Sequence, residues 1–432
     1  MNAIILSIGD ELVLGQTVDT NSAWLSQRLA GAGCAVLAHV TVGDDQAAIE
    51  AAIRQAAGRC DVLLVTGGLG PTADDLTRQA IAAVLGVELE LSQPWVEQLR
   101  EFFRQRQRPM PQANTIQAMI PRGARMIWNH NGTAAGIHAR LSAGEPGRPT
   151  ELFAMPGVPG EMFAMFDRDV MGRLLARAGS AVILSRALHT FGLGESAIAQ
   201  LLGDLMRRDR NPLVGTTVSG GIVSLRINAR FDPRQEAEKQ LAATEQLCRQ
   251  ALGDLIYGAD DQTLAQAVAH LLTGNQQRAT TNVLSVTTAE SCTGGLLAKY
   301  LTDVPGSSSY FRRGWVTYAN EAKTELLGVA ADLLARHGAV SEPVVRAMAQ
   351  GALARAGAAY ALAISGIAGP DGGTPDKPVG TVWIAVAGPS SPDDVTARRF
   401  VMPGDRQMIR DRAVKMALTL LRFRLLGKPT PF

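Results

Sequence analysis

The sequence has few aromatic residues, little net charge and no long apolar run. Aromatic residues make up 5% of the 432 positions, and lysine plus arginine exceed aspartate plus glutamate by 42 − 40 = 2. No segment approaches the roughly 18–20 consecutive apolar residues that a membrane-spanning helix needs. Because the net charge is nearly zero and no block of like charge occurs, we expect no direct binding of nucleic acid or of a membrane surface.

Cysteine and histidine are also scarce. Four cysteines without a C-x-x-C pair form no disulfide framework, and none of the six histidines stands at H-x-x-x-H spacing, so we expect no structural zinc site. The N-terminal segment Met1–Asp10 lacks a cationic start and an A-x-A cleavage site, unlike a secretory signal peptide. These absences predict a soluble, cytoplasmic protein with reduced thiols.

The first third of the chain alternates short apolar runs with helical patterns. The apolar runs predict strands at Ala3–Ile8, Cys34–Val40, Val62–Val65 and Glu151–Ala154. Helical periodicity occupies Asn21–Leu29, Gln46–Ala57, Pro94–Arg106 and Gly160–Ala176. Buried strands separated by helices of this length are typical of βαβ units with a parallel sheet, so we expect a doubly wound α/β domain over residues 1–172.

The pattern changes near residue 178. Strands at Ala181–His189, Leu213–Thr217 and Ile222–Ala229, the last two joined by the turn Ser219–Gly221, precede a helix at Pro233–Leu252. This predicts a small α+β connector over residues 173–257.

A third region, residues 258–428, reads as a C-terminal α/β domain. Its strands are expected at Val283–Thr287, Gly314–Tyr318, Tyr360–Ser365, Gly380–Ala387 and Ala397–Met402. Its helices are expected at Asp261–Asn275, Thr293–Tyr300, Ser341–Ala356 and Asp405–Leu425.

Two acidic segments follow strands of the first domain. Asp10 and Glu11 come directly after the first strand, and Asp74 and Asp75 follow the glycine-rich stretch Thr66–Thr72. Ligands of open α/β sheets bind beyond the carboxyl ends of the strands, where glycines let backbone N–H groups approach a phosphate. We therefore expect a phosphate contact at Gly67, Gly68, Gly70 and Thr72.

Carboxylates beside a phosphate repel it unless a divalent cation lies between them, so Asp10, Glu11, Asp74 and Asp75 predict a metal site. Alternatively, Asp74 and Asp75 complement a helix dipole. We expect Asp74 to cap the following helix and Asp75 to face the loop, with the opposite assignment left open. Asn21 and Glu161 are further candidates for contacts to a ribose or a metal, although Glu161 also suits the start of a helix.

In the last region, Thr288–Gly295 joins a strand to a helix and contains two possible nucleophiles, Ser291 and Cys292. Neither has a histidine nearby in sequence, so the remaining base is a lysine made neutral by burial. Lys323, one turn into a helix that follows a strand, is that candidate. The alternatives are a solvent-exposed Lys323 and a Cys292 that merely packs as an apolar side chain.

These segments together resemble the CinA family (competence/damage-inducible protein A). The N-terminal matches are Gly9–Leu12, Gly15 with Asp19–Ser22, Thr66–Thr72 with Asp74-Asp75, and Pro156–Met162. The C-terminal matches are Ala289–Gly295, Pro305–Ser308, Tyr318–Lys323, His337–Glu342, Gly366–Gly373 and Lys377–Thr381. Ten ordered blocks in two domains make the resemblance specific.

The resemblance implies a molybdopterin-cofactor-binding-like fold for the N-terminal domain and a nicotinamide mononucleotide (NMN) deamidase fold for the C-terminal one. It implies two activities: NMN hydrolysis to nicotinate mononucleotide and ammonia without a cofactor, and ADP-ribose cleavage to AMP and ribose 5-phosphate with Mg²⁺, Mn²⁺ or Co²⁺. In the deamidase domain, a serine and a lysine at the positions of Ser291 and Lys323 are associated with catalysis. The resemblance also implies a homodimer.

Other residues receive roles within this scheme. Tyr318 is expected to position Ser291 or relay its proton, and backbone N–H groups of Thr293, Gly294 and Gly295 to hold an oxyanion or a phosphate. Ser365 and Arg406 are expected to contact substrate, although Arg406 also suits a surface helix end.

The chain departs from the family pattern at three positions. Ala135 stands where proline is usual, which puts the stiffness of one N-terminal loop in question; Ala319 replaces serine and Ser365 replaces threonine. Two alternative functions follow from the family: a non-enzymatic partner in DNA uptake or recombination, and, by fold analogy alone, an N-terminal pterin-binding or pterin-adenylylating module.

Overall fold

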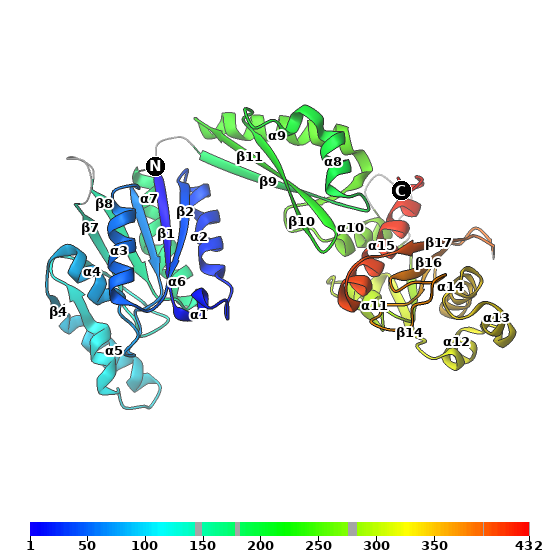
Figure 1. The fold of residues 1–432 in the computed structure, drawn as a ribbon, viewed down its shortest axis with the longest axis horizontal. Coiled ribbons are helices and arrows are strands. Elements are labelled where there is room, and N and C mark those ends of the chain that lie inside the picture. Colours follow the sequence, from blue (N-terminus) through cyan, green and yellow to red (C-terminus); the bar gives the residue numbers. More distant parts are fainter. Residues whose placement is uncertain (143–148, 178–181, 275–282, 392, 432) are drawn as a thin grey trace. The chain divides into compact units, whose positions relative to one another are not determined.

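The computed structural model describes residues 1–142, 149–177, 182–274, 283–391 and 393–431. The chain forms two compact units, one of Met1–Leu184 with Asn228–Ala242, the other of Ser185–Ile227 with Ala243–Phe432 (Figure 1). The four cysteines are free thiols. Among the helices in the described ranges, none has the length and apolar character to cross a membrane.

The N-terminal sheet has six strands in the order β2-β1-β3-β8-β7-β6. They are β1 (Asn2–Ile8), β2 (Ala35–Val42), β3 (Val62–Thr66), β6 (Arg125–Ile127), β7 (Gly136–Leu141) and β8 (Thr150–Met155). The strands β2, β1, β3 and β8 are parallel, whereas β7 pairs antiparallel with both β8 and β6. The doubly wound α/β prediction is confirmed, but the sheet is mixed because β7, which the sequence pattern did not reveal, runs antiparallel to its neighbours β8 and β6.

Helices cover both faces of this sheet, and the alternation of side chains along β1 shows why. Ala3 and Ile5 pack with α2 (Thr20–Gly31), α6 (Pro159–Met165) and α7 (Met171–Arg177). Ile4 and Leu6 face the opposite way and pack with α3 (Gln46–Ala57) and α4 (Thr77–Leu85) (Figure 1). The remaining elements are α1 (Asp10–Val13), β4 (Leu89–Leu91), α5 (Gln93–Gln105), a 3₁₀ helix (Gln112–Ala118), β5 (Met119–Pro121) and a π-helical turn, Phe166–Val170, between α6 and α7.

The middle sheet has the order β10-β11-β9-β12. Its strands are β9 (Val182–Phe191), β10 (Leu213–Ser219), β11 (Ile222–Phe231) and β12 (Ile256–Ala259). The predicted hairpin between β10 and β11 is present, and its glycines take positive φ of 55° at Gly220 and 81° at Gly221. Helix α9 (Arg234–Leu252) matches its prediction, α8 (Glu195–Leu202) was not predicted, and Ala181 lies outside the described residues.

The C-terminal sheet has the order β14-β13-β15-β16-β17. Its strands are β13 (Val286–Glu290), β14 (Phe311–Val316), β15 (Tyr360–Gly366), β16 (Thr381–Ala387) and β17 (Val395–Val401). The first three are parallel and the last two antiparallel. The strand expected to end at Tyr318 ends at Val316, and β13 continues to Glu290, three residues beyond its predicted end.

Helices again cover both faces. One face carries α10 (Leu264–Thr273), α11 (Leu296–Thr302) and α15 (Arg406–Leu426), and the other α12 (Asn320–Leu327), α13 (Ala331–His337) and α14 (Glu342–Ala356). Asn275, the predicted end of α10, lies outside the described residues. The parallel arrangement brings the carboxyl ends of β13 and β14 to one sheet edge, where Ser291 and the chain leading to Lys323 follow.

Candidate functional site

The parallel strands β1, β3 and β8 end at one edge of the N-terminal sheet, and the loops after them enclose a cavity of about 430 Å³. The predicted phosphate-contact residues line it, namely Gly67, Gly68, Gly70 and Thr72. Five carboxylates line it as well, those of Glu11, Asp44, Asp74, Asp75 and Glu161. Most of the residues that the sequence indicated for this site therefore line the cavity. Asp10 does not line it, and Asp44, which lines it, was not among the predicted residues.

The Asp75 carboxylate organises the glycine-rich loop from within. It accepts hydrogen bonds from the backbone N–H groups of Gly70 at 2.6 Å and Thr72 at 2.8 Å. The expectation that Asp74 caps α4 is wrong, because Leu76 occupies the N-cap position and no side chain caps the helix. The acidic pair shapes the loop rather than the helix end.

Below the loop lies Arg78, a residue that the sequence pattern did not single out. It is almost completely buried and donates to the carbonyl oxygens of Leu69 and Gly70. Burial lowers the pKa of Arg78 to about 10, and the nearby Asp75 charge opposes this. At Gly67, whose φ is +104°, an added Cβ would lie 2.2 Å from the carbonyl oxygen of Ile8. The loop is therefore fixed from below and admits no side chain at that position.

Asp10 and Asp44 link two loops at this edge by reciprocal hydrogen bonds. The Asp10 N–H donates to Asp44 Oδ2 at 2.9 Å, and the Asp44 N–H donates to Asp10 Oδ1 at 3.0 Å. Burial raises the pKa of Asp44, as do the neighbouring charges of Asp10, Glu11 and Asp74. Negative charge is concentrated at this edge, which favours a cation there.

In the described ranges, no three His, Cys, Asp or Glu side chains form a group that holds a metal ion by themselves. Magnesium in nucleotide sites takes one or two carboxylates and completes its shell with substrate phosphates and water. The carboxylates around this cavity fit a cation that binds together with a pyrophosphate, and they do not fit a resident all-protein metal centre.

The two further candidates hold the ends of strands together. The Asn21 amide donates to Thr66 Oγ1 at 3.1 Å and to the Gly157 carbonyl at 2.7 Å, while its buried Oδ1 has no partner. Glu161 accepts a hydrogen bond of 2.6 Å from buried Asn129. Glu161 lines the cavity of the glycine-rich loop, whereas Asn21 lines a separate, smaller cavity of about 140 Å³.

The Asn129 side chain also holds the loop whose stiffness was in question because Ala135 stands in place of a proline. It donates to the Ala134 carbonyl at 3.0 Å and accepts from the N–H groups of Asn131 and Gly132, each at 3.0 Å. Side-chain hydrogen bonds thus hold the loop that lacks its usual proline.

In the C-terminal domain, the predicted serine and lysine meet. Ser291 is half-buried after β13, and Lys323 Nζ lies 3.3 Å from Ser291 Oγ. The Lys323 side chain is 0% exposed, in contrast to the surface alternative. Nζ also donates to the carbonyl oxygens of Thr317 at 2.8 Å, Tyr318 at 3.2 Å and Ala319 at 3.4 Å. These carbonyls fix the amine beside the serine hydroxyl.

Burial changes the pKa of Cys292 and that of Lys323 in opposite directions, and both changes bear on which residue is the nucleophile. It raises the pKa of Cys292 to about 12, so this thiol stays protonated at neutral pH. It lowers the pKa of Lys323, which the negative charge of Glu321 opposes. Only a neutral amine can accept the serine proton, and a lowered pKa leaves Lys323 neutral in a larger fraction of molecules near pH 7. The arrangement therefore favours Ser291 over Cys292.

The loop that carries Ser291 is anchored by Glu290, which sequence reasoning missed. The Glu290 side chain is completely buried and accepts hydrogen bonds from the N–H groups of Leu297 at 2.9 Å and Ala298 at 2.8 Å. These are first-turn donors of α11, which have no partner within the helix. Glu290 thereby ties the end of β13 to the start of α11.

The residues Thr293–Gly295 lie between the end of β13 and the start of α11, the two elements that Glu290 joins. Arg410, a second residue that the sequence did not reveal, donates to the Thr293 carbonyl at 2.7 Å. The buried Thr293 hydroxyl has no partner among the described residues, and the N–H groups of Thr293 and Gly295 donate to no acceptor in that part of the chain. The Gly294 N–H is used, because it donates to the Ser291 carbonyl at 3.1 Å. Donors for an oxyanion or a phosphate thus remain at Thr293 and Gly295.

Other predicted residues have different partners. The Tyr318 side chain is 57% exposed, and its hydroxyl accepts from Arg406 at 2.7 Å; no hydrogen bond to Ser291 joins it within the described ranges. Arg406 also donates to the Gly369 carbonyl at 2.6 Å. The buried Ser365 hydroxyl donates to the Ala339 carbonyl at 2.7 Å, which makes it a support for a neighbouring loop.

The fold and these two sheet-edge sites define an α/β protein with a molybdopterin-binding-like domain. Residues 4–176 match the family described as probable molybdopterin binding domain, 185–258 the damage-inducible protein CinA KH domain, and 262–425 the CinA C-terminal domain.

Relatives that match nearly the whole chain carry names of the same family. A putative competence-damage inducible protein of Symbiobacterium thermophilum is 45% identical over 99% of both chains, and a CinA-like protein of Frankia casuarinae is 46% identical over 99% of this chain and 97% of its own. The crystal structure of competence/damage inducible protein CihA from Agrobacterium tumefaciens is 44% identical, covers 33% of this chain and 86% of its own, and has a TM-score of 0.32. The chain belongs to the CinA family, which confirms the resemblance seen in the sequence.

Proposed function

We propose that the C-terminal domain hydrolyses the carboxamide of NMN to nicotinate mononucleotide and ammonia. The observation that carries the proposal is the buried Lys323 Nζ, 3.3 Å from the Ser291 hydroxyl. The family likeness suggests the substrate, and the serine–lysine geometry suggests an acyl-transfer mechanism.

In this mechanism Lys323 takes the Ser291 proton as Oγ attacks the carboxamide carbon. The resulting ammonium returns the proton to the leaving nitrogen, the carbon–nitrogen bond breaks, and ammonia departs. Water then attacks the acyl carbon as Lys323 takes one of its protons. The bond from that carbon to Ser291 Oγ breaks as Lys323 returns the proton to Oγ, and the product acid loses its own proton to solvent and leaves as a carboxylate. The free N–H groups of Thr293 and Gly295 supply donors for the oxyanion, and Arg406 is a phosphate-binding candidate at the same edge.

The lowered pKa of Lys323 fixes the direction of the pH dependence. Its amine must be neutral to accept a proton, so the rate rises with pH through the Lys323 pKa. Because burial lowers that pKa below the ordinary lysine value of about 10.4, the rise occurs nearer to neutrality than for a free lysine.

We also propose that the N-terminal domain cleaves the pyrophosphate of ADP-ribose with a divalent cation. Five carboxylates beside the glycine loop carry this proposal, because they would repel a pyrophosphate without a cation. Glu11 and Asp74 would hold the cation together with the pyrophosphate, since Asp75, Glu161 and Asp44 already hold their loops. Bound there, it would polarise a phosphoryl oxygen and activate a water.

The test is a product screen of the intact chain. NMN and ADP-ribose are supplied separately, in chelator and with Mg²⁺, Mn²⁺ or Co²⁺, and ammonia, AMP and ribose 5-phosphate are measured. We expect ammonia from NMN in chelator, and AMP only with metal. No ammonia under any condition rejects the deamidase, and full ADP-ribose turnover in chelator rejects the metal role.

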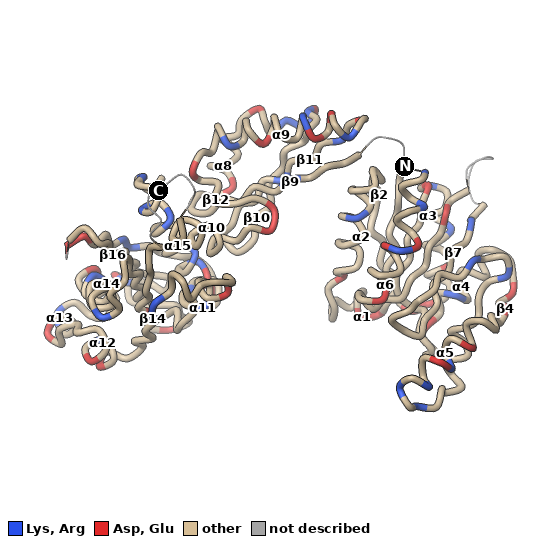
Figure 2. Tube along the Cα trace, turned by 180° about the vertical axis from the view of Figure 1, so that it is seen from behind, with Lys and Arg blue, Asp and Glu red and all other residues tan. Residues whose placement is uncertain are grey.

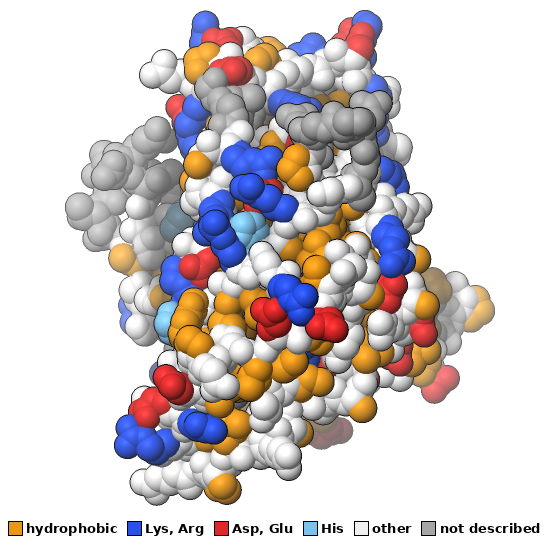
Figure 3. Space-filling model, turned by 90° about the vertical axis from the view of Figure 1, so that its left-hand side faces the viewer, with side chains coloured by type: hydrophobic (Ala, Val, Ile, Leu, Met, Phe, Trp, Pro, Cys, Tyr) orange, Lys and Arg blue, Asp and Glu red, His pale blue; other side chains and the backbone are white. Residues whose placement is uncertain are grey.

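The alternative as a DNA-uptake or recombination partner receives little support from charge. Basic and acidic positions are interspersed along both units (Figure 2), and the face shown in Figure 3 mixes basic, acidic and apolar side chains. A gel shift of DNA at physiological salt would revive this alternative.

The second alternative is a pterin-binding N-terminal module. Tighter binding of a molybdopterin precursor than of ADP-ribose would favour it. We place the protein in the cytoplasm as a homodimer on family likeness and its free thiols.

A further inference from the structure

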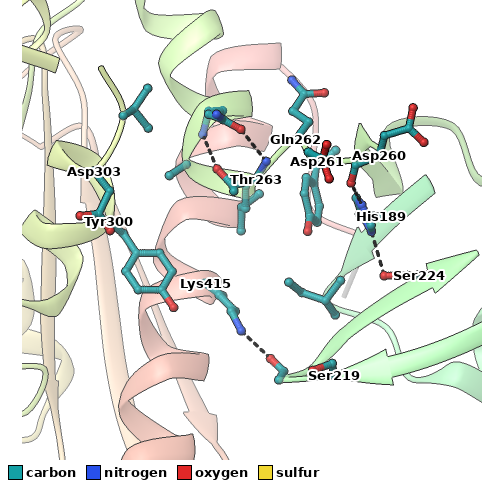
Figure 4. Close-up of a pocket in the computed structure, with 17 residues that line it drawn as sticks. His189, Ser219, Ser224, Asp260, Asp261, Gln262, Thr263, Tyr300, Asp303 and Lys415 are labelled. Carbon is teal, nitrogen blue, oxygen red and sulfur yellow. Dashed lines mark hydrogen bonds between the residues drawn. The ribbon is translucent and has the colours of Figure 1, made fainter. Parts of the chain in front are cut away.

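The second unit contains a cavity of about 560 Å³ that neither proposed activity uses. It lies where the β10–β11 hairpin, the loop after β12, and the helices α10, α11 and α15 meet (Figure 4). Its size falls in the range of about 300–1,000 Å³ that is typical of sites for small organic molecules, and such sites are frequent at junctions between modules.

The lining includes aromatic and apolar side chains, those of Tyr257, Tyr300, Ile222, Leu264 and Val304. Tyr300 comes from α11 and lies beside Asp303 (Figure 4), whereas Tyr257 comes from β12 and stacks with His189. A planar ring packs well against an aromatic side chain. Tyr257 is only 8% exposed, and its hydroxyl has no hydrogen-bond partner in the described part of the chain. The Tyr257 hydroxyl is not one of the fully buried polar atoms without a partner, so it is open to the cavity, where a polar group of a ligand can bond to it.

The charged groups of the lining are already paired, with one exception. Lys415 donates to Asp411 at 2.6 Å and to the Gly220 carbonyl at 2.9 Å. Asp260 is paired with Arg186, and Asp303 with Lys299. Asp261 forms no ion pair or side-chain hydrogen bond within the described residues.

His189 supplies no free cation either. One of its ring nitrogens donates to the Asp260 carbonyl, and the other is hydrogen-bonded to Ser224 at 2.8 Å (Figure 4). The lining therefore offers one unpaired carboxylate and no unpaired cation, which disfavours a phosphate and favours a ligand that donates hydrogen bonds.

We propose that this cavity binds a nucleoside without a phosphate, with its base against the Tyr257 ring and its ribose hydroxyls donating to Asp261. The Tyr257 hydroxyl provides a further polar contact. This class of molecule combines the planar ring, the hydroxyl donors and the absence of negative charge that the lining requires.

The test is calorimetric titration of the full chain with adenosine, AMP and 2′,3′-dideoxyadenosine. We expect adenosine to bind, and AMP and the dideoxy analogue to bind at least about tenfold more weakly. The dideoxy analogue lacks the hydroxyls that would make charge-assisted hydrogen bonds to Asp261, each of which contributes more than a factor of ten. AMP keeps these hydroxyls but adds negative charge near Asp261, with no unpaired cation in the lining to offset it. AMP affinity equal to or greater than that of adenosine overturns the proposal, as does the absence of adenosine binding.

Two variants locate the binding. Asp261→Asn should weaken adenosine binding by about tenfold and Tyr257→Phe by about three- to tenfold, whereas the exposed control Glu97→Gln should leave it unchanged. Asp261 is exposed and Phe keeps the ring of residue 257, so both variants preserve the packing. Unchanged affinity in both variants places the nucleoside elsewhere and overturns the assignment. Binding is read without turnover, so the result is independent of the proposed activities.

Discussion

Replacement of Glu290 by glutamine tests how the Ser291 loop is held. The substitution keeps the side-chain length but replaces one carboxylate oxygen by an NH₂ group, which then faces the N–H of Leu297 or Ala298. A hydrogen bond to a charged group contributes about 1.5–3 kcal/mol, and a buried unsatisfied donor costs about 1–3 kcal/mol. Since one of two bonds is lost in a completely buried setting, we expect Glu290→Gln to lower the free energy of unfolding of the C-terminal unit by about 2–4 kcal/mol.

The assay is chemical denaturation followed by far-UV circular dichroism, together with hydrogen–deuterium exchange of the α11 segment Leu296–Thr302. Exchange should accelerate there, because the first turn of the helix loses its external acceptor. The matched control is Glu325→Gln on α12, an exposed glutamate whose loss should change stability by no more than about 0.5 kcal/mol. Stability and exchange of Glu290→Gln equal to those of the control would refute the anchoring role.

Three further substitutions follow from the same contacts. In Lys323→Met, ammonia release from NMN should fall by at least about 10²–10⁴-fold. The wild type should gain stability as pH rises from the lowered Lys323 pKa toward the ordinary value of 10.5, a slope that Lys323→Met should lack in pH-dependent denaturation. Ala319→Ser should stabilise the protein by about 1 kcal/mol in denaturation, because Ala319 is the uncapped N-cap of α12 with extended backbone. Asp75→Asn should reduce metal-dependent AMP formation from ADP-ribose, because an NH₂ group replaces one of the two carboxylate oxygens that accept from the N–H groups of Gly70 and Thr72; an unchanged rate would show that the loop does not depend on Asp75.

The sequence predicted most of the fold because the strands of both α/β domains are continuous apolar runs. It missed β6, which has three residues, and β7, whose apolar run is interrupted by His138 and Arg140, and it ended β13 too early. The cause at β13 is chemical, because Thr288 and Glu290 are polar residues that the fold buries, and an apolar-run criterion stops before them. Similarly, Tyr318 was assigned to a strand although the chain leaves the sheet after Val316.

The sites were predictable where the chemistry lies beside a strand end, as at Ser291 and at the glycine loop. They were not predictable where the contact is long-range. Arg410 reaches Thr293 across 117 positions of sequence, and Asp44 meets Asp10 across 34 positions. Arg78 lies close to its loop in sequence, but its burial beneath Leu69 and Gly70 depends on how the loop folds back. No local pattern signals such contacts.

The most direct test of the central claim is ammonia release from NMN by the wild type, Ser291→Ala and Lys323→Ala, measured side by side at several pH values. Circular dichroism should first show that the variants remain folded. The account predicts a wild-type rate that rises with pH through the lowered Lys323 pKa, and a loss of at least about 10²-fold in each variant. Ammonia release at the wild-type rate from Ser291→Ala or from Lys323→Ala would contradict it.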